Sequence, residues 1–254
     1  MLLVIDIGNS NIVLGVFQDK TLAHSWRVRT CRDRTVDEYG VLFNNLFTLQ
    51  GLSLQQVESV IVSRVAPPLN EHIMRLARKY LGREALFVEP ADQKIIPVLY
   101  SPPSDVGADR IVNALAAFDL VGGPSIVVDF GTATTFDAIS GRGEYLGGVI
   151  APGVGISADA LFSRAAKLPR IEIKEPARVI GDCTVTSMQS GIFYGYVSLV
   201  EGVLRRMKEE LGPATVIATG GLALRIAPRA EGIDRIEEHL TLHGLRLFYE
   251  RFRE

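Results

Sequence analysis

The sequence predicts an α/β protein built from two duplicated domains, and two observations carry that prediction. Strand-like and helix-like segments alternate along the 254 residues, which is the pattern of α/β folds. An apolar run that ends in Asp-x-Gly also occurs twice, at residues 4–17 (VIDIGNSNIVLGVF) and 127–140 (VVDFGTATTFDAIS). Asp6 and Asp129 of these runs are 123 residues apart, close to half the chain. A repeat at half-length favours duplication over a chance likeness of two short β runs.

Each repeat is expected to begin its domain with an antiparallel meander. The first meander has strands at 2–7, 12–17 and 22–29, and the second has strands at 125–130, 134–140 and 144–150. In residues 22–29 the even-numbered positions, which include Trp26 and Val28, form one face, and Arg27 and Arg29 lie on the other. Further strands are expected at 60–62, 84–88 and 215–219.

Helices are expected to fill the remainder of both halves. Thr35-x-x-Glu38 is a capping box that begins a helix. Apolar spacing and flanking Gly or Pro predict further helices at 67–81, 108–120, 157–166 and 184–211, and one at the C-terminus. No low-complexity linker separates the halves, so we place the domain boundary near residue 116, inside or just after the helix that begins near Asp109.

Composition and charge exclude several classes of protein. The 27 basic and 29 acidic residues give a net charge of −2, which offers no attractive surface for nucleic acid or an anionic membrane. No segment approaches the roughly 18 apolar residues of a membrane span, and the N-terminus lacks the basic region of a signal peptide. Cys31 and Cys183 are far apart, and the four histidines are scattered. We therefore expect a cytoplasmic protein without disulfide, zinc site, nucleic-acid partner or membrane partner.

The first Asp-x-Gly motif, residues 6–11 (DIGNSN), has the chemistry of a phosphate-binding turn. Gly8 has no Cβ, so a ligand can approach the backbone closely. Neighbouring amides and the Asn and Ser side chains can donate to phosphate oxygens, while Asp6 can hold Mg²⁺ directly or through water. An ordinary hairpin is the alternative for this motif alone, since the chain has no GxxxxGK[ST] loop and no GxGxxG motif after a strand.

The second motif, residues 129–135 (DFGTATT), repeats the first with hydroxyls in place of amides. Two such turns that face each other across a cleft would clamp one polyphosphate and its cations. Residues 216–221 (VIATGG) add an apolar strand that runs into Gly-Gly, where adenosine can lie against bare backbone. Taken alone, this third segment fits a plain strand–loop–helix connection equally well.

Residues 107–110 (GADR) supply candidate catalytic chemistry. An acid in the first turn of a helix is commonplace, but here Asp109 follows a rigid Pro-rich loop at 102–105 and adjoins Arg110. Asp109 can accept the proton of a hydroxyl that attacks a γ-phosphate, and Arg110 can bind a carboxylate. Tyr100 is placed to close the same pocket.

Gly191 and Gly195 lie one helical turn apart and suit a close helix contact. We favour an interface between two subunits there over packing within one chain.

Along the chain, DIGN at 6–9, GADR at 107–110, DFGTAT at 129–134 and GGVIAPG at 147–153 follow one another in the order seen in the type III pantothenate kinases, which this sequence resembles. The resemblance covers the whole chain and departs only slightly, with Ser10 where Thr is frequent. It implies membership of the acetate and sugar kinase, heat-shock ATPase and actin superfamily. The implied fold is α/β, with two duplicated ribonuclease-H-like (actin-like ATPase) domains, residues 1–116 and 117–254, and a cleft between them.

The resemblance also implies a reaction and its residues. The reaction is ATP-dependent phosphorylation of pantothenate to 4'-phosphopantothenate, the first step of coenzyme A biosynthesis, with Asp109 as general base. Asp129 would hold K⁺ or NH₄⁺, and Mg²⁺ would accompany ATP near Asp6. The family is dimeric, with Thr184 reaching the pocket of the partner subunit. The implied ATP-binding residues are Asp6, Ile7, Gly8, Asn9, Ser10, Asn11, Ile12, Val13 and Thr132. The implied pantothenate-binding residues are Tyr100, Gly107, Ala108, Asp109, Arg110 and Thr184.

Two other functions stay open at this point. One is a nucleotide-dependent regulator that binds ATP and transfers nothing, and the other is a sugar or acyl kinase of the same superfamily. The Asp109–Arg110 pair favours chemistry over a pure switch, because a switch needs neither residue. The acceptor depends on the pocket residues, which a panel of substrates would identify.

Overall fold

The structure is a computed structural model that describes residues 1–64, 67–89, 95–165 and 167–253. The chain forms two compact units, and the first combines two separate stretches of sequence. Unit 1 consists of Met1–Ala116 and Leu240–Glu254, and unit 2 of Ala117–His239. The division falls inside helix α3 (Ala108–Val121), which begins in unit 1. No helix of the described residues is long and apolar enough to cross a bilayer.

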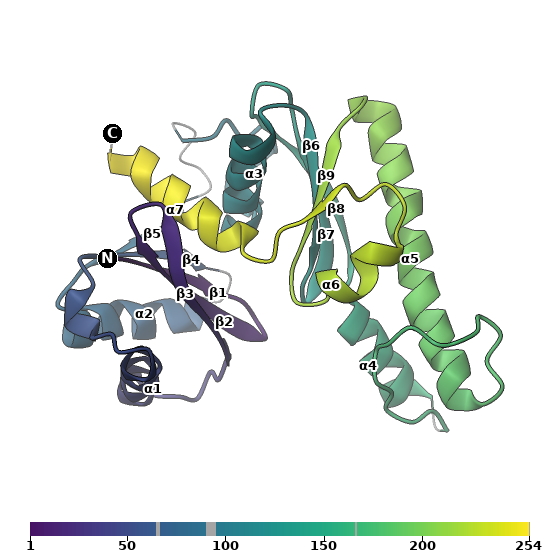
Figure 1. Ribbon diagram of the computed structural model, residues 1–254, viewed down its shortest axis with the longest axis horizontal. Helices are drawn as coiled ribbons and strands as arrows, with labels where there is room; N and C mark the ends of the chain where they lie inside the picture. Colours follow the sequence, from purple (N-terminus) through teal and green to yellow (C-terminus); the bar gives the residue numbers. More distant parts are fainter. Residues whose placement is uncertain (65–66, 90–94, 166, 254) are drawn as a thin grey trace. The chain divides into compact units, whose positions relative to one another are not determined.

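The sheet of unit 1 begins with the predicted meander (Figure 1). Strand β1 (Leu2–Ile7) pairs antiparallel with β2 (Asn11–Gln18), which pairs antiparallel with β3 (Thr21–Arg29). On the other side of β1, strands β4 (Ser59–Arg64) and β5 (Ala85–Phe87) continue the sheet in parallel. The strand order is therefore β3-β2-β1-β4-β5.

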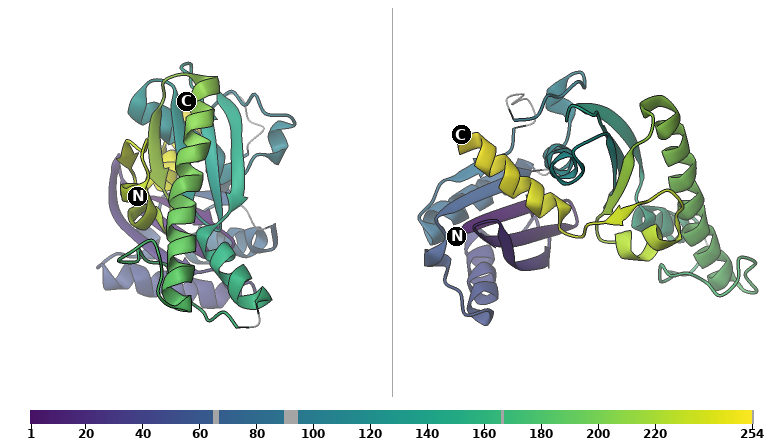
Figure 2. Two further views of the ribbon diagram at one scale, coloured as in Figure 1. Left: turned by 90° about the vertical axis from the view of Figure 1, so that its right-hand side faces the viewer. Right: turned by 45° about the horizontal axis from the view of Figure 1, so that its top comes forward.

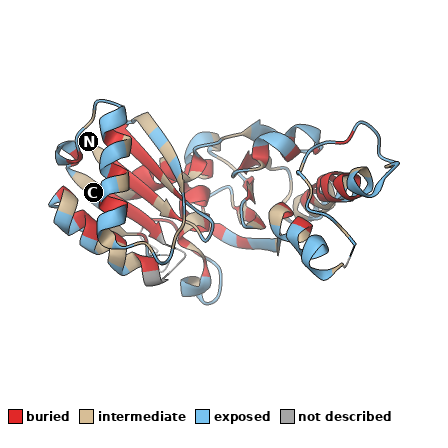
Figure 3. Ribbon diagram, turned by 90° about the horizontal axis from the view of Figure 1, so that it is seen from below, coloured by how far each residue is buried: buried red, intermediate tan, exposed pale blue. Residues whose placement is uncertain are grey.

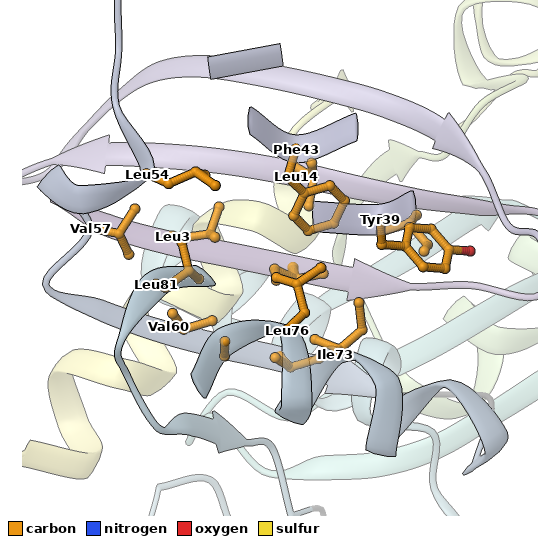
Figure 4. Packing of buried hydrophobic residues seen from close by; sticks show 14 of the residues in the cluster. Leu3, Leu14, Tyr39, Phe43, Leu54, Val57, Val60, Ile73, Leu76 and Leu81 are labelled. Atoms are coloured by element: carbon orange, nitrogen blue, oxygen red, sulfur yellow. The ribbon is translucent and has the colours of Figure 1, made fainter. Parts of the chain in front are cut away.

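One face of this sheet packs against helices α1 (Val36–Leu49) and α2 (Pro67–Leu76), and α2 runs on through a π-helical turn at Ala77–Leu81. Figure 4 shows Tyr39 and Phe43 of α1, and Ile73 and Leu76 of α2, packed against Leu3 and Leu14 of the sheet. Burial of this apolar surface is the main force that holds the layers together. Strands β1, β2 and β4 are buried along most of their length, whereas the edge strands β3 and β5 are not (Figure 3).

The predicted capping box begins α1. The Glu38 N–H donates to Thr35 Oγ1 at 3.3 Å, and the Thr35 N–H donates to the Glu38 carboxylate at 2.7 Å. These bonds satisfy amides that the first turn of a helix otherwise leaves without partners.

The other face of the sheet is covered by α7 (Leu240–Arg253), which contacts β1, β4 and β2. A Cβ on Gly15 of β2 would lie 3.0 Å from Leu242, and a Cβ on Gly244 of α7 would lie 2.0 Å from the Val112 carbonyl oxygen of α3. The expected second domain, 117–254, therefore needs a correction. Residues 240–254 belong to unit 1, because α7 buries its apolar residues on the first sheet.

Unit 2 repeats the plan of unit 1. Strands β6 (Ser125–Phe130), β7 (Ala133–Ile139) and β8 (Tyr145–Pro152) form the meander, and β9 (Thr215–Thr219) and β10 (Arg235–Ile236) continue the sheet in parallel. The order β8-β7-β6-β9-β10 is the order of unit 1 with each strand replaced by its counterpart. The predicted duplication is thus visible in strand order and direction.

Helices α4 (Val154–Arg164), α5 (Thr184–Leu211) and α6 (Ala223–Ile226) contribute to one apolar core with the second sheet. The long helix α5 is clearest in Figure 2. Helix α4 begins three residues earlier than predicted, because Gly153 is its N-cap. Short 3₁₀ turns lie at Leu54–Gln56, Pro103–Asp105 and Ala227–Arg229.

Candidate active site

Asp6 lies on the face of the first sheet opposite α1 and α2. Leu3, Ile5 and Ile7 of β1 belong to the apolar core, and side chains alternate between the two faces of a strand. In register, Asp6 lies opposite Val13 on β2 and beside Ser63 on β4. This face therefore carries a carboxylate next to a buried hydroxyl at the end of the central strand.

The turn after Asp6 is held in place by β3. The Gly8 N–H donates to the Asn11 carbonyl at 2.9 Å and closes the turn. Thr30, just beyond β3, donates its hydroxyl to the Gly8 carbonyl at 2.8 Å and its N–H to the Ser10 carbonyl at 3.0 Å. The side chains of Asn9, Ser10 and Asn11 are exposed, so this fixed backbone corner presents amide and hydroxyl groups to solvent, which are the groups of a phosphate-binding turn.

The second candidate group in unit 1 is Asp109, in the first turn of α3. The Arg110 N–H donates to the Asp109 carboxylate at 2.9 Å. A Cβ on Gly107 would lie 2.4 Å from Asp109 Oδ1, so residue 107 has to be glycine for the carboxylate to take this position. Burial raises the pKa of Asp109 above its ordinary value, and the Arg110 amide and positive charge oppose that rise.

Asp129 occupies the corresponding position in unit 2. The core of that unit includes Ile126, Val128 and Phe130, so Asp129 lies on the face away from α4 and α5. Its register neighbours are Thr135 on β7 and Thr219 on β9. A hydroxyl residue thus lies beside each aspartate on the parallel partner strand, Ser63 of β4 in one unit and Thr219 of β9 in the other.

Two glycines allow the chain to pack against the Asp129 turn. Gly220 follows β9 with φ of +94°, and a Cβ there would lie 2.4 Å from Asp129 Oδ1. Gly153 precedes α4, and a Cβ there would lie 2.0 Å from the Thr132 carbonyl oxygen and 2.7 Å from that of Gly131. Both contacts are closer than any side chain tolerates, so the turn is enclosed by bare backbone.

The oxygens around Asp129 suit a hard monovalent cation. Asp129 Oδ1 and the Ala133 carbonyl oxygen each lie 3.4 Å from the position that a Gly131 Cβ would occupy, so both oxygens border the space beside Gly131. Carboxylate and carbonyl oxygens are the ligands that K⁺ prefers. By contrast, no cluster of three or more His, Cys, Asp or Glu side chains occurs among the described residues. Mg²⁺ is usually bound by one or two carboxylates together with substrate phosphates and water, so a single carboxylate such as that of Asp6 is compatible with it.

The sequence-predicted residues fall into two groups. Residues 6–13, Tyr100 and 107–110 lie in unit 1, while Asp129, Thr132 and Thr184 lie in unit 2. Tyr100, Thr132 and Thr184 are exposed. That the two Asp-x-Gly turns face one cleft remains a prediction. Sequence reasoning missed Ser63, because only the pairing of β4 with β1 brings it beside Asp6.

The chain was compared with known proteins. The profile of the family described as "Type III pantothenate kinase" matches residues 2–206. A type III pantothenate kinase of Brevibacillus brevis is 55% identical over 99% of both chains. Among solved structures, a putative Baf family transcriptional activator from Campylobacter jejuni gives a TM-score of 0.60 at 19% identity, covering 99% of this chain and 98% of the other. MreB 5 of Spiroplasma citri, solved with AMPPNP, gives 0.57 at 11% identity, covering 99% and 96%. These two likenesses concern the fold, which is the two-domain actin-like ATPase and sugar kinase fold.

Proposed function

The chain belongs to the type III pantothenate kinase family, and from this membership we propose how its residues carry out the reaction. The protein is a kinase that acts on pantothenate, with ATP as the phosphoryl donor, for coenzyme A biosynthesis. Its proposed product is 4'-phosphopantothenate. The observation that carries the mechanism is the half-buried Asp109 at the start of α3, whose carboxylate is held by the Arg110 N–H at 2.9 Å.

Asp109 is the general base in this mechanism. It takes the proton of the pantothenate hydroxyl as that oxygen attacks the γ-phosphorus, the bond from the γ-phosphorus to the β,γ-bridging oxygen breaks, and ADP leaves. A carboxylate with its ordinary pKa is a weak base near neutral pH. Burial raises the pKa of Asp109, so its carboxylate binds a proton more strongly. Arg110 sits beside it and binds the pantothenate carboxylate, with Tyr100, Gly107, Ala108 and Thr184 completing that pocket.

The nucleotide phosphates bind at residues 6–13, with a further contact from Thr132. The turn at Gly8–Asn11, which the Thr30 hydroxyl holds through the Gly8 carbonyl, supports this assignment because its exposed amide and hydroxyl side chains can donate hydrogen bonds to phosphate oxygens. Asp6 lies beside the turn and binds the Mg²⁺ that accompanies ATP, directly or through water. Asp129 with its neighbouring carbonyl oxygens binds K⁺ or NH₄⁺, which neutralises phosphate charge.

The cation site is tested by Asp129→Ala. This variant is expected to lose the activation of the kinase by added KCl while keeping the fold.

A second copy of this chain is the proposed partner, and it supplies Thr184 to the pocket. In unit 2, Ile150 is 64% exposed, Ile180 is 87% exposed, and Phe162 and Val185 are also exposed. Gly191 and Gly195 are exposed on α5 and have open space where a Cβ would lie. Exposed apolar side chains favour a protein contact on this unit, and a helix stripe without Cβ atoms suits close approach of a second helix. Sedimentation of the wild type and of Ile150→Glu tests the dimer, which the charge should weaken.

The general base is tested by a pair of variants four residues apart. Asp109→Asn keeps the shape of the side chain but cannot accept the proton, and a general base contributes a factor of about 10²–10⁴ in rate. Asp105→Asn is the control, because Asp105 is exposed in the neighbouring 3₁₀ turn. Phosphopantothenate formation with ATP, Mg²⁺ and K⁺ should fall by that factor in Asp109→Asn and stay at the wild-type rate in Asp105→Asn. Full activity of Asp109→Asn would overturn the assignment.

We expect the enzyme to work in the cytoplasm, where its substrate ATP is found, and both of its cysteines are free thiols. The regulator and the sugar or acyl kinase left open by the sequence are tested by the same purified protein. Transfer of phosphate to a sugar, or nucleotide binding without transfer to any acceptor, would contradict the family assignment.

A further inference from the structure

Two arginines on β3 point to the face of the sheet that carries Asp6. Trp26 and Val28 of the same strand pack with the core on the α1 side, where the Trp26 ring stacks on Phe47 at 5.2 Å between centroids. Because side chains alternate along a strand, Arg27 and Arg29 project from the opposite face. Helix α7 covers that face over β1, β2 and β4, but both arginines are exposed.

The register places these arginines beside the turn that follows Asp6. Arg29 lies opposite Asn11, and Arg27 lies opposite Val13, which itself lies opposite Asp6. Neighbouring strands are about 4.8 Å apart, so the Cα of Arg27 lies roughly two strand spacings from that of Asp6. The side chain of Arg27 is long enough to pass over Val13 toward the carboxylate.

The segment that carries the arginines is fixed to the turn. Thr30 directly follows Arg29, and its two hydrogen bonds to the Gly8 and Ser10 carbonyls join the end of β3 to the turn. Arg32 extends the same positive charge, with its guanidinium 3.5 Å from Asn9 Oδ1. A shift of the turn would therefore move the arginines with it.

Nothing in the described part of the chain neutralises Arg27 or Arg29. Neither side chain takes part in an ion pair or a hydrogen bond with the residues that the structure describes. Two like charges two residues apart on one face of a strand repel each other. An anion bound between them would relieve that repulsion, and Arg binds phosphate through two parallel N–H···O bonds.

Charged residues on an edge strand also have a simpler role, which is to prevent edge-to-edge pairing between sheets. That role would be served by charges anywhere along β3. Here the first half of the strand, Thr21–Ser25, contains no Lys or Arg, and both arginines lie in the half beside the turn. The distribution of charge thus follows the phosphate-binding turn and not the length of the edge.

We propose that Arg27 and Arg29 bind the terminal phosphate of the nucleotide at the Asp6 turn and distinguish ATP from ADP. The inference rests on the proposed function, because it needs the nucleotide phosphates at residues 6–13. The guanidinium groups hold the γ-phosphate and offset its negative charge, which favours the triphosphate over the diphosphate. Neither arginine carries a proton transfer.

The test is a comparison of four proteins, all full-length: the wild type, Arg27→Gln/Arg29→Gln, Arg27→Lys/Arg29→Lys and Arg75→Gln. Arg75 lies on α2, on the opposite side of the same unit, and is 64% exposed in its ion pair with Glu71, so its variant controls for loss of an arginine at the surface. Calorimetry measures the Kd of Mg-ATP and Mg-ADP, and the kinase assay measures KM for ATP.

We expect the glutamine pair to weaken Mg-ATP binding by about tenfold or more, the loss of a hydrogen bond to a charged group, and to leave Mg-ADP binding within about twofold. The lysine pair should lose part of the ATP affinity, because it keeps the charge but not the planar fork. Arg75→Gln should behave as the wild type does.

Two results would overturn the inference while leaving the proposed function intact. One is wild-type affinity for ATP in the glutamine pair, whether or not that variant aggregates. Aggregation with unchanged affinity would assign the arginines to edge protection. The other is equal loss of ATP and ADP binding, which would mean that they do not reach the terminal phosphate. Failure of the wild type to phosphorylate pantothenate would instead contradict the proposed function.

Discussion

Gly153 is expected to be indispensable for the shape of the Asp129 turn, and Gly153→Ala tests this. The backbone of Gly153 has φ of −72°, which any residue adopts, so the change brings no conformational strain of its own. Its whole effect comes from the new Cβ, which would lie 2.0 Å from the Thr132 carbonyl oxygen and 2.7 Å from that of Gly131. The prediction therefore isolates a single packing contact.

The size of the effect follows from that geometry. Ordinary van der Waals contact begins at 3.4 Å, so the Thr132 carbonyl and the Gly153 backbone have to separate by about 1.4 Å. Both groups are backbone: Thr132 lies in the two-residue bend between β6 and β7, and the Gly153 carbonyl accepts the Ser157 N–H at the start of α4, so neither side yields easily. Overpacking of this kind costs about 1–3 kcal/mol. At about 2–4 °C of Tm for each kcal/mol in a chain of this length, the midpoint should fall by about 2–12 °C.

Gly155→Ala is the matched control, two residues further along in α4. A Cβ on Gly155 meets nothing within 4 Å, and replacing glycine by alanine in a helix stabilises by about 0.5–1 kcal/mol. Thermal unfolding followed by circular dichroism should show a lower Tm for Gly153→Ala and an equal or higher Tm for Gly155→Ala. The kinase assay adds a second measurement, since a displaced Thr132 loop should raise the KCl concentration needed for half-maximal activity.

The reasoning is refuted if Gly153→Ala unfolds at the wild-type temperature and needs no additional KCl. Such a result would mean that the loop at Gly131–Thr132 moves freely away from α4, and that its carbonyl oxygens are not held in place. Loss of stability with unchanged KCl dependence would keep the packing argument and remove the link to the cation.

Three further predictions concern unit 1. Burial raises the folded-state pKa of Asp109 above its ordinary 3.8, so the folded state loses stability as the pH rises from that value through the raised pKa. Asp109→Asn should therefore raise Tm relative to the wild type at pH 7 and lose this advantage near pH 3.8. An advantage in Tm that does not depend on pH would contradict the shift in pKa. Thr35→Ala removes the N-cap of α1 and should cost about 1 kcal/mol, while Thr48→Ala, which removes a hydroxyl bonded within the same helix, should cost less; urea unfolding of the two variants compares them. Tyr39→Phe removes the phenol oxygen that bonds the Cys31 carbonyl at 2.9 Å and the Cys31 N–H at 3.0 Å, and should lower the free energy of unfolding by about 1–3 kcal/mol. Urea unfolding at the wild-type midpoint would argue against those bonds.

Much of the fold was predictable from local sequence. The Asp-x-Gly repeat located both meanders, and strands β1, β6 and β9 and helix α5 have the predicted bounds. These segments are predictable because their apolar periodicity and their capping or turn residues agree. The extra strand β10 has only two residues, which is too short for a periodic pattern to reveal.

The candidate site was predictable in its carboxylates and glycines, and less so in its surroundings. Asp6, Asp109 and Asp129 each lie two residues from a glycine in the sequence, which marks a close backbone approach. No local pattern marks Ser63, and the alternation in β3 put Arg27 and Arg29 on one face without saying what that face meets. Those relations arise from strand pairing between distant residues.

The sequence by itself determined that the chain is duplicated, where every strand except β10 and most helices lie, and which family the chain belongs to. Tertiary structure alone decided that α7 returns to unit 1, since a helix near the end of the chain can bury its apolar face on either sheet. It also decided that burial raises the pKa of Asp109 and that Gly153 and Gly220 enclose the Asp129 turn. Desolvation and steric contact depend on which atoms surround a group in space, and the order of residues along the chain does not specify that.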